Sequence, residues 1–259
     1  MKKIILITGS TGLVGSESVK FFLEKGFTVV GIDNNKRKFF FGDEGSTYWI
    51  KKKLTQNKSY IHHNISVTNY NQLKDLFYKY KKKISLIIHC AAQPSHDWAY
   101  KDPLIDFDIN SKSTLYLLEL LRKFSPKAKF ILTSTNKVYG DNPNKLRYLE
   151  KSTRFELESK NKFFKGISEK MSIDDCKHSL FGVSKTYGDL ITQEYGKNYG
   201  LKTIVFRAGC ISGPNHSGAL LHGFLSYLVK SCILKKEYTI IGYKGKQVRD
   251  NIHSYDLVK

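Results

Sequence analysis

The sequence predicts an α/β protein built on a parallel, doubly wound sheet, with a small and incomplete C-terminal substrate domain. Short apolar runs of strand length alternate with helix-like segments along most of the chain. The first apolar run, residues 4–7, is followed at once by glycines at positions 9, 12 and 15 and then by a helical pattern. Alternating strands and helices are typical of parallel sheets, because parallel neighbours need a crossover connection.

The expected elements follow from apolar runs for strands and from helical periodicity for helices. Six strands are expected at residues 4–8, 28–32, 60–62, 86–91, 130–134 and 203–207. Four helices are expected near residues 13–25, 69–80, 103–124 and 182–199. Residues 36–58 fit neither pattern well, so we expect a loop with one short helix there.

The first strand, the glycine turn and the following helix have the features of a phosphate-binding loop. Gly9 allows a tight turn, Gly12 lets a pyrophosphate approach the backbone, and Gly15 lets helix and strand pack closely. The spacing is G-x-x-G-x-x-G. We expect the intervening residues of this turn to contact the cofactor as well, namely Thr11, Leu13 and Val14.

The second expected strand ends in Asp33, about twenty residues after the glycines, where dinucleotide-binding sheets carry an acidic residue. A carboxylate at this position accepts hydrogen bonds from the adenosine ribose diol and repels a 2′-phosphate. The sequence therefore predicts NAD rather than NADP as the cofactor, with Asn34 beside the ribose.

The composition limits the partners. The chain has 259 residues and a formal net charge of +20, but almost all of the positive charge is lysine spread along the sequence. Arginine is the residue preferred for forked contacts to phosphates and bases, so the charge favours a solvated surface over a nucleic-acid patch. The four cysteines form no C-x-x-C pair, which predicts free thiols and no metal site. With no signal peptide and no transmembrane-length apolar run, we expect a cytoplasmic protein without a membrane or nucleic-acid partner.

Two segments interrupt the alternation on the carboxyl side of later strands. Residues 140–177 are polar and charged, and residues 211–259 follow the last expected strand. Ligands of open α/β sheets bind beyond the carboxyl ends of the strands, so both segments are candidate parts of a substrate site. We expect residues 1–210 to form the cofactor-binding domain and residues 211–259 part of a substrate domain, truncated because residues 256–259 read as the opening turn of a helix.

Four motifs identify a family. They are HCAAQ at residues 89–93, STNKVYGD at 134–141, SLFGVSK at 179–185 and GKQVRD at 245–250. With the glycine turn, they resemble the extended short-chain dehydrogenase/reductase family of nucleotide-sugar epimerases and dehydratases over essentially the whole chain. The resemblance implies a Rossmann NAD-binding domain, a nucleotide-sugar substrate, a homodimer, and epimerisation through transient oxidation of the sugar by NAD.

The resemblance also implies roles for individual residues. Thr135 corresponds to the catalytic hydroxyl and Lys185 to the catalytic lysine, which also binds the cofactor. Arg249 corresponds to the residue that binds the substrate pyrophosphate, a task suited to a forked donor. The other implied cofactor contacts are Asn64 (where the family usually has Asp), Ile65, Ala91, Ala92, Gln93, Asn110 and Thr133. The other implied substrate contacts are Asn136, Lys137 and Asn215.

Phe181 departs from the family pattern. The family's catalytic pair is Tyr-x-x-x-Lys, and Phe181 stands at the tyrosine position, four residues before Lys185. A phenol can take the proton of the sugar hydroxyl, whereas phenylalanine cannot. Three explanations remain open: another base acts, such as Tyr139, His178 or a water held by Thr135; the residue is an engineered change; or the protein binds both ligands without turnover. A 4,6-dehydratase is disfavoured, because that class usually has an acidic residue where Asn136 stands.

Overall fold

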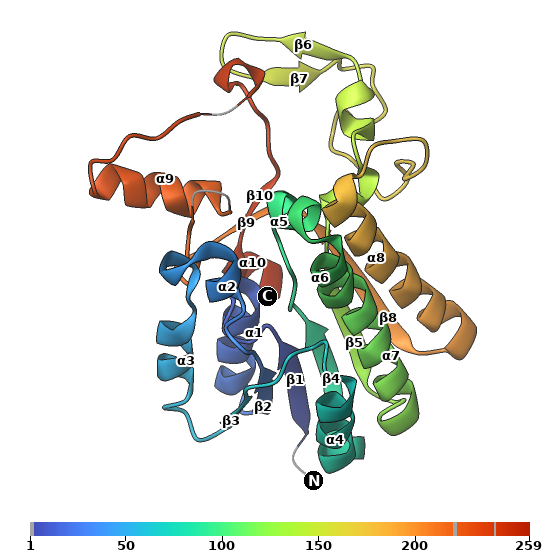
Figure 1. Cartoon of the computed structure of the whole chain (residues 1–259). Helices are drawn as coiled ribbons and strands as arrows, with labels where there is room; N and C mark the ends of the chain where they lie inside the picture. Colours follow the sequence, from blue (N-terminus) through green and yellow to red (C-terminus); the bar gives the residue numbers. More distant parts are fainter. Residues whose placement is uncertain (1–2, 220–221, 241) are drawn as a thin grey trace.

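The computed structural model describes residues 3–219, 222–240 and 242–259. Its centre is a six-stranded sheet with the order β3-β2-β1-β4-β5-β8, in which every neighbouring pair is parallel (Figure 1). The strands are β1 (Ile4–Thr8), β2 (Thr28–Ile32), β3 (Tyr60–His63), β4 (Ile84–His89), β5 (Lys129–Thr135) and β8 (Lys202–Ala208). The chain order reverses between β1 and β4, which places a ligand crevice at the carboxyl ends of these two strands. The predicted fold class is confirmed.

Helices cover both faces of the sheet. On one side α1 (Leu13–Glu24) packs on β1 and β2, with α3 (Tyr48–Leu54) beside it. On the other side lie α4 (Tyr70–Tyr80), α7 (Ser113–Phe124) and α8 (Ser179–Tyr199) (Figure 1). Each side has its own apolar core, the first around Val19 and Ile50 and the second around Phe77, Leu117 and Phe130. All five residues of β1 are buried, as expected for a central strand covered on both faces.

The structure differs from the expectation in three places. Residues 36–58 contain α2 (Arg37–Phe41), the 3₁₀ turn η1 (Asp43–Gly45) and α3 in place of a loop with one short helix. The helix expected at 103–124 is α6 (Pro103–Phe107), the π-helical turn η3 (Asp108–Lys112) and α7 in direct succession. Strand β4 begins and ends earlier than expected, because the chain leaves the sheet after His89 and turns across the end of β1.

The region beyond the carboxyl ends of the strands is formed by two segments. Residues 140–177 carry η5 (Asn142–Lys145) and the hairpin of β6 (Tyr148–Glu150) and β7 (Phe155–Leu157), which projects away from the sheet (Figure 1). The C-terminal segment contains β9 (Cys210–Ser212), α9 (Phe224–Ile233), η6 (Tyr243–Gly245), β10 (Asn251–His253) and α10 (Ser254–Val258).

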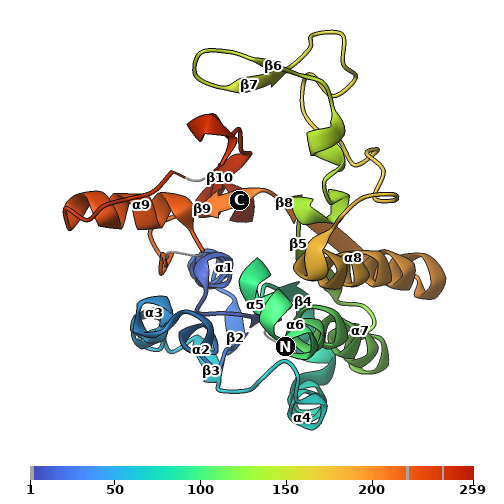
Figure 2. The ribbon, with the colours of Figure 1, turned by 45° about the horizontal axis from the view of Figure 1, so that its top comes forward.

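These outer segments are tied to each other and to the sheet. Strands β9 and β10 pair in parallel, and α10 packs against α1. Glu150 in the hairpin forms ion pairs with Lys244 and Lys246. Figure 2 shows α9 and α8 on opposite sides of the molecule, with β9 and β10 between them. In the described residues, no helix has the length and apolar character needed to cross a membrane.

Candidate active site

A cavity of about 650 Å³ runs along the carboxyl ends of β1, β2, β4 and β5 and extends to β9 and β10. It contains most of the residues selected from the sequence. These are Gly9, Gly12, Leu13, Val14, Gly15, Asp33, Asn34, Ile65, Ala91, Ala92, Thr133, Thr135, Asn136, Lys137, Phe181, Lys185, Asn215 and Arg249. The residues proposed for cofactor and substrate therefore line one continuous space.

The glycine turn forms one wall of the cavity. Gly9 has a φ of 64°, and its amide donates a hydrogen bond of 2.8 Å to the carbonyl of Ile32. A Cβ on Gly15 would overlap the carbonyl oxygen of Gly9, so helix α1 can approach the turn this closely only with glycine at that position. Because the first turn of α1 carries no acidic residue, its free backbone N–H groups favour an anion at the helix N-terminus.

Asp33 lies at the end of β2, between this cavity and a smaller one. Its carboxylate accepts hydrogen bonds from the amide of Thr11 at 3.0 Å and the amide of Asn35 at 2.7 Å, one through each oxygen. The smaller cavity, about 190 Å³, is lined by Thr11, Asp33, Asn34 and Asn64 among others. The two backbone contacts fix the carboxylate and leave each oxygen with capacity to accept from a diol.

Gln93 and Asn110 lie behind the cavity wall. Both side chains are buried, and the amide of Gln93 donates to Oδ1 of Asn110 at 2.9 Å. Asn110 in turn donates to the carboxylate of Asp106 at 2.9 Å. The π-helical turn η3 carries Asn110 inward to this position. These two residues hold the shape of the segment after β4, next to Ala91 and Ala92, which face the cavity.

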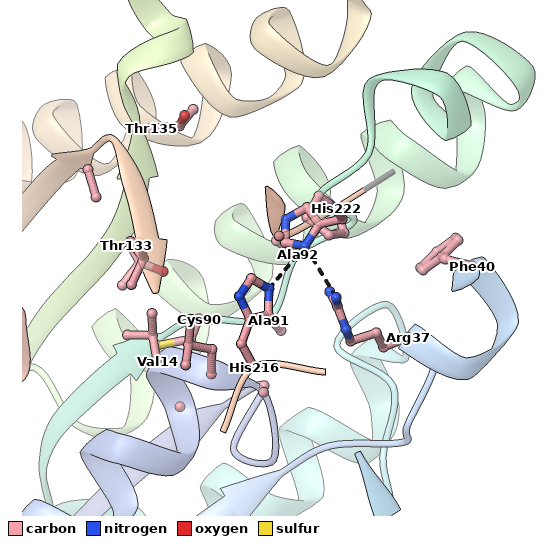
Figure 3. Close-up of a pocket in the computed structure, with 18 of the residues that line it drawn as sticks. Val14, Arg37, Phe40, Cys90, Ala91, Ala92, Thr133, Thr135, His216 and His222 are labelled. Atoms are coloured by element: carbon pink, nitrogen blue, oxygen red, sulfur yellow. Dashed lines mark hydrogen bonds between the residues drawn. The ribbon is translucent and has the colours of Figure 1, made fainter. Parts of the chain in front are cut away.

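Lys185 and the threonines of β5 form the inner end of the cavity. Lys185 is almost fully buried, and its ammonium donates a hydrogen bond of 2.9 Å to the carbonyl of Thr133. Burial lowers the pKa of Lys185 to about 8. Thr135 lies further along β5 at its carboxyl end, and Figure 3 shows both threonines on this strand. A lysine amine and a threonine hydroxyl are thus available at the carboxyl ends of the central strands.

The structure places Phe181 at this inner end but directs Tyr139 and His178, the two side chains that the sequence offered as bases, elsewhere. Phe181 is buried, one helical turn before Lys185 on α8. The phenol oxygen of Tyr139 accepts a hydrogen bond from Arg207 at 3.1 Å. Nε2 of His178 lies 2.9 Å from the carbonyl of Val138, which makes this nitrogen a donor. Neither Tyr139 nor His178 lines the described part of the cavity.

A histidine that the sequence argument did not select lies beside Phe181. His96 is the first residue of α5 (His96–Lys101), and its ring centroid is 4.9 Å from that of Phe181, with the rings inclined at 62°. Nδ1 of His96 lies 2.9 Å from Oγ of Ser179, and His96 lines the cavity. Ser179 has a φ of 63°, a left-handed conformation that costs about 1–3 kcal/mol for a residue other than glycine. The only sequence signal was the position of His96 in the segment that follows β4.

Arg37, His216 and His222 form a second cluster that the sequence argument did not select. Arg37 donates to the carbonyl of Ser217 at 2.8 Å and lies 3.2 Å from Nδ1 of His222 (Figure 3). Burial lowers the pKa of His216 to about 4 and that of His222 to about 3. This cluster joins α2 to the segment before α9, so the C-terminal segment closes over the Asp33 end of the cavity.

Lys137 and Arg249 supply positive charge at the opposite side. Lys137 lies in η4 (Asn136–Tyr139) and Arg249 precedes β10, and both line the cavity. Burial, and then the nearby Arg249, lower the pKa of Lys137. Asn215 is buried at the wall and donates to Oγ of Ser16 on α1 at 3.0 Å. Among the described residues, no group of three or more His, Cys, Asp or Glu side chains is arranged to hold a metal ion.

Comparison with known proteins gives relatives that are nucleotide-sugar epimerases. The sequence model described as "NAD dependent epimerase/dehydratase family" matches residues 5–259. CDP-paratose 2-epimerase of Salmonella typhi is 32% identical over 259 residues, covering 98% of this chain and 72% of that protein. The UDP-glucuronate 4-epimerase of Thermodesulfobacterium geofontis is 27% identical, covering 98% of this chain and 69% of that protein.

A solved structure of a nucleotide-sugar epimerase is also similar to this chain. UDP-glucuronic acid 4-epimerase from Bacillus cereus, in complex with UDP-glucuronic acid and NAD, superposes with a TM-score of 0.74 at 25% identity. The match covers 98% of this chain and 70% of that one. The motifs at residues 89–93, 134–141 and 245–250 resemble those of CDP-tyvelose (CDP-paratose) 2-epimerases, and the comparison confirms this resemblance. NAD is likewise confirmed as the cofactor of the family. The chain belongs to the NAD-dependent epimerase/dehydratase family.

Proposed function

We propose that this protein epimerises a nucleotide-activated sugar at one ring carbon. The observation that carries the proposal is the continuous cavity, which joins the glycine turn and Asp33 to Thr135, Lys185 and the cationic pair Lys137 and Arg249. A dinucleotide and a nucleotide sugar can meet in such a space, with the reacting carbon between the cofactor end and the substrate end.

The residues present fit NAD. The glycine turn, on which α1 packs closely because Gly15 has no Cβ, the N-terminus of α1 and the fixed carboxylate of Asp33 suit a pyrophosphate and an adenosine ribose. When bound, NAD supplies a reversible acceptor for the hydride of one sugar carbon. Lys185 is proposed to donate a hydrogen bond to the ribose next to the nicotinamide, and Thr135 to hydrogen-bond the reacting sugar hydroxyl.

The substrate end supports a nucleoside diphosphate. Arg249 and Lys137 are two cations at one side of the cavity, where the charge of a diphosphate would offset their mutual repulsion. Asn136 and Asn215 are proposed as further polar contacts to the nucleotide sugar. Because the 32% identical relative is a CDP-paratose 2-epimerase, CDP-activated deoxyhexoses are the first substrates to test.

Phe181 favours a second candidate, a protein that binds NAD and a nucleotide sugar without converting it. Phenylalanine cannot take the proton that the family's tyrosine takes. The two candidates share every binding residue and differ only in whether another group in the cavity accepts the proton. A 4,6-dehydratase has less support, because Asn136 cannot act as the acid of that reaction.

We propose a cytoplasmic homodimer. Leu104 and Phe107 on α6, and Val183 and Leu190 on α8, are exposed apolar side chains on two helices that pack against each other. Exposed apolar side chains gathered on packed helices are typical of protein–protein contacts. The four cysteines are free thiols, which suits a reducing compartment. Light scattering of the full-length protein at several concentrations tests the dimer; a monomer at all concentrations contradicts it.

The function is tested on the full-length protein in two steps. Mass spectrometry of the small molecules released on denaturation is expected to find NAD. Incubation with CDP-, UDP- and GDP-sugars, followed by NMR of the products, is expected to find an epimer of one of them. Binding of NAD and a nucleotide sugar without any product would support the second candidate, and absence of NAD binding would contradict both.

A further inference from the structure

Epimerisation through a ketone needs a group that removes the proton of the sugar hydroxyl and later returns it. The position that carries this group in the family is Phe181, whose ring has no proton acceptor. The phenol of Tyr139 and Nε2 of His178 are hydrogen-bonded to Arg207 and to the carbonyl of Val138, outside the cavity lining. The acceptor must therefore be a water held by Thr135, which lines the cavity, or a side chain from another element.

Few titratable groups face the catalytic end of the cavity. Lys185 directs its ammonium to the carbonyl of Thr133. The Cys90 thiol, partly buried at the cavity wall, remains protonated, since desolvation raises its pKa to about 12. Lys137 lies near both Arg249 and His96, and as a cation its ammonium donates hydrogen bonds and accepts none. His216 and His222 contact each other and Arg37 at the Asp33 end.

We propose that Nε2 of His96 is the general base that replaces the family's tyrosine, with Ser179 as its positioning residue. The proposal rests on the proposed function and deepens it by naming the missing group. The ring of His96 lies against the ring of Phe181, so an imidazole stands directly beside the position where the family has its phenol. His96 is exposed to the cavity, where a substrate can reach it.

The hydrogen bond to Ser179 fixes the ring. With the proton on Nδ1, donated to Oγ of Ser179, the lone pair of Nε2 is free, and Nε2 has no hydrogen-bond partner among the described residues. Oγ of Ser179 also accepts from the amide of Gly182 at 3.2 Å. The left-handed φ of Ser179 holds this hydroxyl at the start of α8, and strain of this kind is often retained where it positions a functional group.

The proton and electron balance is complete with the groups named. The O–H bond of the sugar hydroxyl breaks and an N–H bond forms at Nε2, while the electron pair of the adjacent C–H bond leaves as hydride to the nicotinamide. The alcohol becomes a ketone, and a bound NAD would supply the acceptor of the two electrons. After the ketone has turned, hydride returns to its other face, and His96 gives the proton back to the oxygen.

The surroundings of His96 keep it neutral at neutral pH. Burial, and then the charge of Lys137 in η4, lower its pKa, while Asp97 on its own helix opposes them. His222 from the C-terminal segment is a further titratable neighbour. Helix α5 packs on α8, whose titratable groups on this side are Lys185 and, just before the helix begins, His178. Because the base must be unprotonated, activity is expected to fall as the pH drops through the pKa of His96.

The test compares His96→Gln with Tyr100→Gln, an exposed position on the same helix. His96→Gln is expected to lower kcat about 10²- to 10⁴-fold, as for loss of a positioned base. NAD affinity should be unchanged and the acid limb of the pH–rate profile should disappear. Tyr100→Gln should behave as wild type. In the His96→Gln background, Phe181→Tyr is expected to restore hydride transfer, because it returns the family's own base.

A second readout does not depend on turnover. NMR titration of the His96 ring protons is expected to give a pKa below the ordinary value, and Ser179→Ala should change that pKa. A His96→Gln protein with wild-type kcat overturns the proposal. The proposal is also overturned if the pH–rate profile of this variant still rises with the ionisation of a group at the pKa of Lys185. If wild type converts no nucleotide sugar although it binds NAD, the proposed function fails and the base assignment fails with it.

Discussion

Arg207 donates a hydrogen bond to the phenol oxygen of Tyr139 and, through two other nitrogens, binds both carboxylate oxygens of Asp189. Asp189 is completely buried, and its carboxylate also accepts from Ser134 at the end of β5. Tyr139 is thus the outer member of a buried charged network that ties β5, α8 and β8 together. This network gives Tyr139 a packing role.

Tyr139→Phe is expected to destabilise the fold without stopping hydride transfer. The change removes one hydrogen bond to a charged group, which costs about 1.5–3 kcal/mol in free energy of unfolding. Urea unfolding gives the stability and the epimerisation assay gives the rate. A variant with wild-type stability but no activity would instead make Tyr139 the base.

Gly15→Ala is expected to abolish NAD binding and to lower stability, because its Cβ would overlap the Gly9 carbonyl oxygen and push α1 away from the turn. Gly26→Ala is the matched control. No atom lies near its Cβ, so it should cost only about 1–2 kcal/mol for the left-handed φ of 78° and leave NAD binding intact. Calorimetric titration with NAD and thermal unfolding check both variants; equal NAD affinity in the two would contradict the packing argument.

Asp33→Asn is expected to weaken NAD binding by about 1.5–3 kcal/mol, the range for a hydrogen bond to a charged group. The variant should also lose most of its preference for NAD over NADP, because the charge that repels a 2′-phosphate is gone. Titration of wild type and variant with both cofactors measures this. Tighter binding of NADP than NAD by the wild type would refute the assignment.

Arg249→Ala is expected to weaken nucleotide-sugar binding by about 1.5–3 kcal/mol and to leave NAD affinity unchanged. Arg249 lines the cavity near Lys137, where the substrate pyrophosphate is proposed to bind. Arg154→Ala, on the β6–β7 hairpin, serves as the control for loss of one positive charge. Titrations with CDP-, UDP- and GDP-sugars and with NAD give both affinities. Equal losses of affinity for both ligands would contradict the assignment of Arg249 to the substrate pyrophosphate.

His89 predicts a loss of stability on acidification. It is buried, with Nδ1 2.7 Å from Oγ1 of Thr8, and burial lowers its pKa to about 3. In the unfolded chain His89 takes up a proton at its ordinary pKa of about 6.5. The stability that comes from keeping His89 neutral is therefore complete above about pH 6.5 and is lost as the pH falls toward the lower pKa of the folded protein. Within this range, each unit by which the pH falls lowers the free energy of unfolding by up to about 1.4 kcal/mol.

The check is denaturant unfolding of wild type and His89→Gln at several pH values. The variant should be less stable at neutral pH, since it disturbs the contact with Thr8. The difference should shrink as the pH falls to about 5, because the variant lacks the titrating group. A difference that does not change with pH would show that His89 does not titrate on unfolding.

Local apolar patterns in the sequence were sufficient to predict the strands of the central sheet. Strands β1 and β2 were predicted to the residue, because their apolar runs end at a glycine turn and at Asp33. Residues 36–58 contain two helices where the sequence predicts only one. Their apolar positions, such as Phe40 and Ile50, are buried against different cores, so no single helical stripe marks them in the sequence.

The parts of the site that depend on tertiary contacts could not be read from the sequence. His96 meets Ser179 and Phe181 only because α5 packs on α8, and Arg37 meets His222 only because the C-terminal segment returns over α2. Gln93 was selected by its motif, yet its hydrogen bonds to Asn110 and Asp106 appear only once the π-helical turn is in place.

The most direct test of epimerisation by transient oxidation is the isotope content of the product formed in deuterium oxide by the NAD-loaded protein. Hydride that leaves and returns within the cavity does not exchange with solvent. The account therefore predicts an epimer of the nucleotide sugar whose inverted carbon keeps its original hydrogen, with no loss of water from the sugar. Deuterium at that carbon, a product lighter by one water, or no product from any nucleotide sugar that binds would contradict it.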